Sequence, residues 1–220
     1  MAAVDKVADP GDAFRFARSL QLMEHSGVIV GAATRWLDLG CNQGQFLRYL
    51  SERFALKAIG ADIWDPALKS AQDSNWEYHQ CDFAQGLPDC EPVDVLSAME
   101  VLEHIIDTDQ FLSRAFDLVR PGGSILISTP NINCLRNRLL VPLGAYPYGL
   151  EYKNLIHHVR LYNVPALRDH LAEYGFRDIS IWGVAFLPLS SRLGGGALSR
   201  SLAERFPELC NNIIAVARRG

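Results

Sequence analysis

The chain has 220 residues, of which 49% are hydrophobic and 21% are charged, and its formal net charge is −4 at pH 7. This composition is that of a globular protein rather than a disordered one, and no apolar run reaches the length of a membrane span. A net negative charge offers no overall attraction to a polyphosphate backbone, so we expect a small-molecule acceptor as partner, with no nucleic acid and no membrane.

The five cysteines are odd in number and scattered, and they never form a C-x-x-C pair. This spacing argues against a disulfide framework and against a zinc knuckle. The N-terminal stretch has no apolar core of the kind found in secretory signals. We therefore expect a cytoplasmic protein, as a monomer or a homodimer.

The predicted elements alternate along the chain. After an N-terminal helix over 12–23, runs of strand length predict strands over 35–39, 58–62, 76–81, 93–98, 125–129, 176–183 and 213–218. Helical spacing and capping residues predict helices over 45–53, 66–73, 110–119 and 165–174. Repeated βαβ crossovers of this kind give a doubly wound parallel sheet, whose ligand crevice lies at the carboxyl ends of its strands.

The first of these strand ends leads into a glycine-containing loop, from Gly40 to Gly44. A dinucleotide fingerprint starting at Gly40 requires further glycines where Asn42 and Gln45 stand. Asp38 would repel a pyrophosphate but attract the ammonium group of a bound amino acid. A nicotinamide-dependent oxidoreductase is therefore the weaker alternative.

The second and third strand ends each carry an acid. Asp62 can accept hydrogen bonds from both hydroxyls of a ribose, and Asp82 can accept one from the exocyclic amine of adenine, while the Phe83 amide can donate to a ring nitrogen. Singly, an acid after a strand is commonly a helix cap. Together, the ordered set fits an adenosine joined to an amino acid without phosphate, as in S-adenosyl-L-methionine.

Through D-L-G-C-N-Q-G-Q-F, G-A-D-I, C-D-F, E-V-L-E-H and L-V-R-P-G-G, residues 35–218 resemble the class I S-adenosylmethionine-dependent methyltransferases. The resemblance implies an α/β, Rossmann-like sheet of seven strands, mostly parallel with one antiparallel strand near the C-terminus. It also implies cofactor-binding residues, namely Asp38, Gly40, Gly44, Asp62, Asp82, Phe83 and Met99. Asn42 stands where many members carry glycine, although asparagine also tolerates left-handed conformations.

The fourth strand end carries a possible metal site. If a helix began at Met99, then Glu100, Glu103 and His104 would share one face. Two carboxylates and an imidazole suit Mg²⁺, Mn²⁺, Fe²⁺ or Zn²⁺, and His158 would complete the set. This pattern resembles metal-dependent O-methyltransferases of the ubiquinone-biosynthesis and small-RNA 2′-O types, in which the cation lowers the pKa of a hydroxyl.

A metal-free interpretation stays open, because E-V-L-E-H also resembles members in which the acids cap a helix. In that case His104 or His158 would be the catalytic general base, since an imidazole titrates near neutrality. The remaining histidines, among them His170, are assigned no role.

The chain is interpreted as one methyltransferase domain. It comprises an N-terminal helical cap (1–34), a cofactor-binding core (35–130), a substrate lid insertion (131–160) that contains several tyrosines, and a C-terminal helix with strands (161–220). The predicted function is methyl transfer to a hydroxyl of a sugar, a phenol or a natural-product intermediate. Transfer to nitrogen or carbon is the alternative within the same class.

Overall fold

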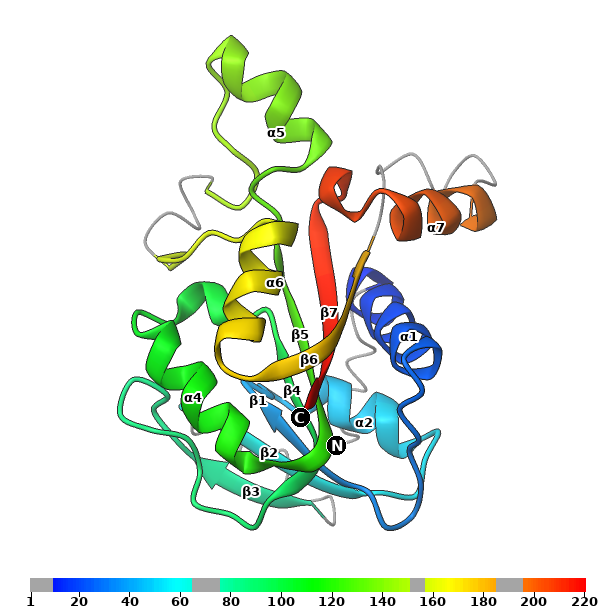
Figure 1. Ribbon diagram of the computed structural model, residues 1–220, viewed down its shortest axis with the longest axis vertical. Coiled ribbons are helices and arrows are strands. Elements are labelled where there is room, and N and C mark those ends of the chain that lie inside the picture. The colour runs from blue at the N-terminus through cyan, green and yellow to red at the C-terminus, as the bar shows by residue number, and fades with distance from the viewer. Residues whose placement is uncertain (1–9, 65–75, 151–156, 185–195) are drawn as a thin grey trace, which may run out of the picture.

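The computed structural model describes residues 10–64, 76–150, 157–184 and 196–220. One sheet forms its centre, with the strand order β3-β2-β1-β4-β5-β7-β6 (Figure 1). The strands are β1 (Arg35–Leu39), β2 (Lys57–Asp62), β3 (Glu77–Gln80), β4 (Val93–Met99), β5 (Val119–Pro130), β6 (Phe176–Gly183) and β7 (Asn212–Arg219).

The directions of the strands confirm the predicted sheet. The first five pair in parallel, whereas β7 is antiparallel to both of its neighbours, β5 and β6. A single strand near the C-terminus therefore runs against the others. The carboxyl ends of β1 to β4 consequently meet along one edge.

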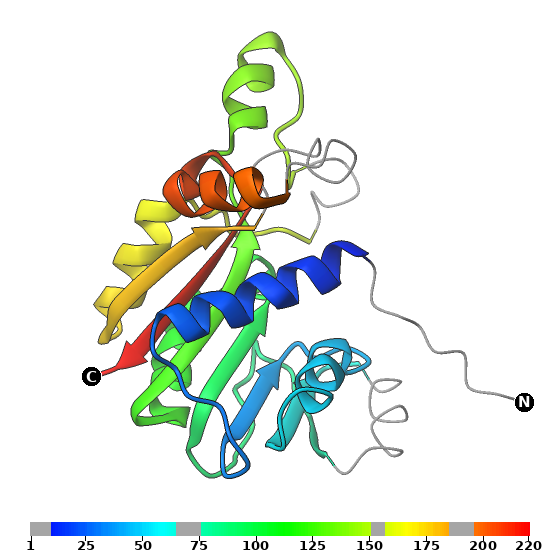
Figure 2. The same ribbon diagram turned by 90° about the vertical axis from the view of Figure 1, so that its right-hand side faces the viewer.

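Helices cover both faces of this sheet, which is the doubly wound arrangement (Figures 1 and 2). The α-helices are α1 (Pro10–His25), α2 (Gln45–Ser51), α4 (Thr108–Leu118), α5 (Leu135–Leu140), α6 (Val164–Glu173) and α7 (Gly196–Arg205), and the 3₁₀ turns are η1 (Leu102–His104), η2 (Val141–Leu143) and η4 (Pro207–Leu209). No described helix combines the length and the apolar character needed to span a bilayer.

The core has two layers because successive strand side chains point to opposite faces. In β1, Trp36 packs with the helices α1 and α2, whereas Leu37 and Leu39 pack with α4 and α6. The indole N–H of Trp36 donates to the Ser97 hydroxyl of β4 at 2.8 Å, so this buried polar atom is satisfied. The sheet is thereby fixed between two apolar layers.

Three parts of the prediction differ from the structure or lie beyond it. The helix expected over 66–73 falls outside the described residues. β5 begins at Val119 rather than after the Pro121–Gly123 turn, because its pairing with β4 jumps from Val119 to Ser124 and leaves the turn as a bulge, with Gly122 at φ 76°. Finally, α5 and α7 form where no helix was predicted, and α5 projects away from the sheet together with η2 (Figure 1).

Candidate active site

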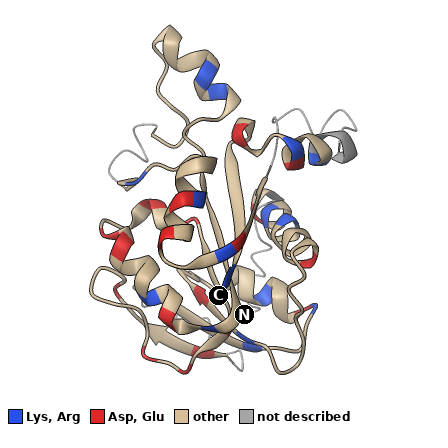
Figure 3. Ribbon diagram, in the orientation of Figure 1, with Lys and Arg blue, Asp and Glu red and all other residues tan. Residues whose placement is uncertain are grey.

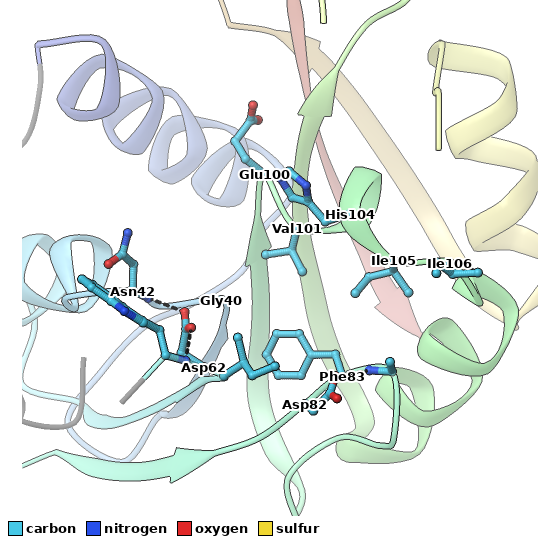
Figure 4. Close-up of a pocket in the computed structure, with 13 residues that line it drawn as sticks. Gly40, Asn42, Asp62, Asp82, Phe83, Glu100, Val101, His104, Ile105 and Ile106 are labelled. Atoms are coloured by element: carbon cyan, nitrogen blue, oxygen red, sulfur yellow. Dashed lines mark hydrogen bonds between the residues drawn. The ribbon is translucent and has the colours of Figure 1, made fainter. Parts of the chain in front are cut away.

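A cavity of about 510 Å³ opens at the carboxyl ends of the parallel strands (Figure 4). Its walls come from the segments that follow β1, β2, β3 and β4, and consist of Gly40, Asn42, Asp62, Ile63, Trp64, Asp82, Phe83, Ala84, Glu100, Val101, His104, Ile105 and Ile106. Open parallel sheets bind ligands at this edge. The crevice predicted from the strand ends is therefore present.

The loop after β1 turns sharply because three of its residues have left-handed backbone. The φ angles are 70° at Gly40, 48° at Asn42 and 75° at Gly44. A Cβ on Gly40 would overlap a methyl group of Val101, so no side chain fits there. Asn42 adopts the conformation that glycine would otherwise supply, and its N–H donates to Asp62 Oδ2 at 2.8 Å.

The two acids predicted for ribose and adenine both lie on the cavity wall. Asp62 Oδ1 accepts a hydrogen bond from the Trp64 amide at 2.9 Å, and Asp82 Oδ1 accepts one from the Ala84 amide at 3.0 Å. Phe83 lines the wall beside Asp82. These side chains are held by their own loops, so the wall exists before any ligand enters.

Three predicted cofactor residues, Asp38, Gly44 and Met99, do not line this cavity. Asp38 is 3% exposed and accepts a 2.6 Å hydrogen bond from the Ser97 hydroxyl. Burial raises the pKa of Asp38 to about 7, against the lowering effect of that hydrogen bond and with a further rise from Asp62. Gly44 is the N-cap residue of α2, and Met99 packs into the core on the side of α1.

A buried carboxylate and two imidazoles meet beside the cavity. Glu103, His104 and His158 each offer one potential ligand atom, and these atoms lie within 4.8 Å of one another. Glu103 is 2% exposed, and its Oε2 has no hydrogen-bond partner among the described residues. Burial, followed by the charge of Glu100, raises the pKa of Glu103 well above the usual carboxyl range.

The two imidazoles are both oriented by backbone carbonyls. His104 Nδ1 lies 2.9 Å from the carbonyl oxygen of His157, and His158 Nδ1 lies 2.6 Å from that of Gly149. Because a carbonyl only accepts, each ring has a proton on Nδ1, and the neutral form of each ring then carries its lone pair on Nε2. Desolvation lowers the pKa of His104, against the opposing effect of its carbonyl partner.

The helix expected from Met99 does not form, and this changes the place of Glu100. β4 extends through Met99, Glu100 has φ 56°, and the chain enters η1 only at Leu102. The Glu100 carboxylate accepts hydrogen bonds from the Ser128 hydroxyl at 2.7 Å and the Asn212 amide at 2.8 Å. The left-handed turn thus separates Glu100 from the group formed by Glu103, His104 and His158.

Sequence reasoning missed the residues that support this site. Ser97 holds Asp38, while Ser128 and Asn212 hold Glu100. Arg15 of α1 lies 3.6 Å from Glu100 Oε2. Each of these pairs is distant in the sequence or crosses between strands, so no local motif marks it.

The chain is similar to known methyltransferases in sequence. A family model described as a methyltransferase domain matches residues 7–181. A ubiquinone biosynthesis O-methyltransferase of Brucella anthropi is 30% identical over 168 residues, which are 71% of this chain and 65% of the relative. The mitochondrial ubiquinone biosynthesis O-methyltransferase of Bos taurus is 28% identical over 70% of this chain and 44% of the relative. The chain thus spans less than two thirds of the length of these relatives.

The fold is also similar to solved structures. An S-adenosylmethionine-dependent methyltransferase from Archaeoglobus fulgidus superposes with a TM-score of 0.65 at 20% identity, covering 97% of this chain and 96% of that chain. At such low identity the likeness concerns the fold alone. It matches the seven-stranded sheet described above.

Proposed function

Because this chain belongs to the class I S-adenosylmethionine-dependent methyltransferases, we propose that it transfers the methyl group of that cofactor to a hydroxyl oxygen of a small molecule. The observation that carries the proposal is one cavity lined in order by the left-handed loop at Gly40 and by Asp62, Asp82 and Phe83. The names of the matching relatives, ubiquinone biosynthesis O-methyltransferases, support oxygen as the acceptor atom.

We assign the cofactor across this cavity in the order of the strands. Gly40 would contact the methionine end, and Gly44, Asp38 and Met99, which do not line the cavity, would support this loop from behind. Asp62 would bind the ribose hydroxyls, and Asp82 and Phe83 the adenine. The support for this order is that ribose and adenine contacts need a carboxylate and an amide at adjacent strand ends, which is where these residues lie.

The acceptor would approach from the other side, beside His104 and His158. Its oxygen attacks the sulfonium methyl, so that a C–O bond forms while the C–S bond breaks and its electron pair returns to sulfur as a neutral thioether. The hydroxyl proton would pass to the Nε2 lone pair of one of these imidazoles. Holding both reactants in line supplies much of the rate enhancement.

The residues present fit a divalent cation at Glu103, His104 and His158. Glu103, His104 and His158 form a two-histidine, one-carboxylate donor set, in which one buried Glu103 oxygen has no hydrogen-bond partner among the described residues. Each histidine Nδ1 has the backbone carbonyl partner that ligating histidines usually have, so Nε2 of each neutral ring is the atom that would bind the cation. A bound cation would lower the pKa of the acceptor hydroxyl.

Calorimetric titration with Zn²⁺ tests this assignment. The wild-type protein should bind Zn²⁺, and Glu103→Gln should weaken the binding at least about tenfold, the effect expected for loss of a ligand group. Equal binding by both proteins would contradict the assignment.

Residues 131–150, which contain α5 and η2, are proposed to form the acceptor side of the site. Within this segment, the Tyr148 hydroxyl donates a hydrogen bond to Asn212 Oδ1 at 3.0 Å. The Asn212 side-chain amide in turn donates to the carboxylate of Glu100, which lies on the cavity wall. α5 carries Arg136 and Arg138 and no acid. Its ribbon, at the top of Figure 3, accordingly has blue segments and no red one. The projecting segment is thereby connected to the cavity by hydrogen bonds.

The acceptor atom can be identified with isotope-labelled cofactor. Incubation of the protein with a metabolite extract and methyl-labelled S-adenosylmethionine should give a labelled product whose methyl group is an ether on analysis by mass spectrometry and NMR. A label on nitrogen or carbon would contradict oxygen transfer while leaving the family unchanged. Boiled protein serves as the control.

A further inference from the structure

The segment that carries His158 is a strap, defined here as residues 157–163, which crosses over η1. The amides of Val159 and Arg160 donate to the Glu103 carbonyl at 2.8 and 3.1 Å. The Ile132 amide donates to the Tyr162 carbonyl at 2.9 Å. The strap therefore bridges the metal-ligand candidates on η1 and the end of β5.

Tyr162 is the one buried side chain of the strap, all of whose residues are described. It is 6% exposed and belongs to the core beside Phe111 and Leu167, whereas Val159 and Leu161 are 45% and 48% exposed. The strap thus has a single side-chain anchor in the core. A buried phenol needs a hydrogen-bond partner for its hydroxyl.

The Tyr162 hydroxyl has a side-chain hydrogen bond with Thr108, and its other partner belongs to a relay outside the cavity. The Tyr162 hydroxyl lies 3.0 Å from His170 Nδ1 on α6, and His170 Nε2 lies 2.9 Å from Asp109 Oδ1 in the first turn of α4. The Asp109 carboxylate is 74% exposed at its side chain, and the hydrogen bond from His170 lowers its pKa. An ionised Asp109 accepts a hydrogen bond from Nε2–H, and Nδ1 of the neutral His170 ring can then accept the Tyr162 O–H.

The position of the strap determines the hydrogen bonds made by Nδ1 of His104 and of His158. The carbonyl that accepts from His104 Nδ1–H belongs to His157, which is the first residue of the strap. His158, the second residue, is held through its own Nδ1 by Gly149. A shift of the strap would move both contacts together.

We propose that Tyr162, His170 and Asp109 are positioning residues, which seat the strap and thereby fix the Nδ1–H tautomers of His104 and His158. The relay fastens the strap to α6 and α4, and the strap presents one imidazole and orients the other. In the neutral form of these rings, Nε2 then carries the lone pair that would take the acceptor proton or bind a cation. The catalytic role of these tautomers rests on the proposed function, whereas the tautomers can be measured whether or not that function is correct.

The test is the tautomer state of the imidazoles, read by long-range ¹H–¹⁵N NMR of protein labelled at its six histidines. At pH 8, above the ordinary histidine pKa, the wild-type protein should show His104 and His158 as Nδ1–H tautomers. His104→Gln and His158→Gln assign the two patterns. In Tyr162→Phe we expect the ratio of Nδ1–H to Nε2–H at both residues to fall about fivefold, the change that loss of one hydrogen bond brings.

Two further variants make the result decisive. Asp109→Asn changes an exposed side chain and should lower the ratio of Nδ1–H to Nε2–H at His104 and His158, as Tyr162→Phe does. If Tyr162→Phe does not fold, Asp109→Asn alone decides the question. Tyr49→Phe, on α2 and away from the strap, should leave both patterns as in the wild type. Unchanged patterns in folded Tyr162→Phe and Asp109→Asn would overturn the proposal, and this outcome is independent of whether the protein binds S-adenosylmethionine.

Discussion

Asp38 shows how a single buried acid makes the stability of the protein depend on pH. Its carboxyl group is held by Ser97 beneath the loop, and its pKa is raised to about 7 by burial. An acid whose folded-state pKa is raised holds its proton more tightly in the folded protein than in the unfolded chain. Its stabilising contribution is therefore complete below about pH 4 and is lost as the pH rises through about 7.

We expect this group to make the free energy of unfolding fall with rising pH by up to about 1.4 kcal/mol per pH unit between about pH 4 and 7. Urea unfolding of wild type and Asp38→Asn at pH 5, 6, 7 and 8 measures the contribution as the difference between two slopes. The variant should show the shallower fall. Parallel curves for the two proteins would contradict a protonated Asp38 in the folded state.

At this scale, the sequence was informative where a residue's role depends on its place after a strand. The place of Asp62, Asp82 and Phe83 on the cavity wall could be predicted, because residues at the carboxyl ends of parallel strands line the cavity. The contacts of Glu100 could not be predicted. They depend on its own left-handed backbone and on Ser128 and Asn212, which come from other strands. The relay through His170 likewise joins two helices that share no motif.

Among the elements, the turn between β1 and α2 depends on its glycines. Gly40 has φ 70°, and a Cβ there would overlap Val101, whose own position is fixed by the end of β4. The turn therefore needs both a left-handed backbone and the absence of a side chain. This is why a short motif could identify the loop from sequence.

Gly40→Ala should lower the free energy of unfolding by about 1–3 kcal/mol and abolish cofactor binding, because the side chain is both strained and obstructed. Gly31→Ala is the matched control, since a Cβ at Gly31 would meet no atom within 4 Å. Urea unfolding and calorimetry measure the two effects. Equal stability of both variants would show that the loop tolerates a different path.

α4 was predictable from its spacing, but it begins at Thr108 rather than at Gln110, because Asp107 caps it by accepting a hydrogen bond from the Gln110 amide. β5 began earlier than expected because pairing with β4 overrode the Pro-Gly-Gly signal. The turn at Glu100 was mistaken for a helix because its residues have helical spacing, while sheet pairing carries β4 through Met99. Long-range pairing thus decided the elements that local patterns left open.

Across the whole molecule, the alternation of strands and helices was sufficient to predict a doubly wound sheet and the edge that holds the cavity. One antiparallel strand near the C-terminus was expected from family resemblance rather than from any local pattern, and the structure shows that it is β7, which lies between β5 and β6. The projecting segment after β5 was expected as an insertion, but its hydrogen-bond connection through Tyr148 and Asn212 is a property of the folded chain. Helices cover both faces of the sheet, so we expect a ligand to enter at the edge formed by the carboxyl ends of the parallel strands.

The cavity at this edge is expected to bind an adenosyl amino acid rather than a dinucleotide, and calorimetry tests this expectation most directly. The protein should bind S-adenosylhomocysteine and should show no heat with NADH. Asp62→Asn should weaken the binding about 10- to 100-fold, the range expected for loss of a charge-assisted hydrogen bond. Binding of NADH, or no heat with S-adenosylhomocysteine in the folded wild-type protein, would contradict the assignment of the cavity.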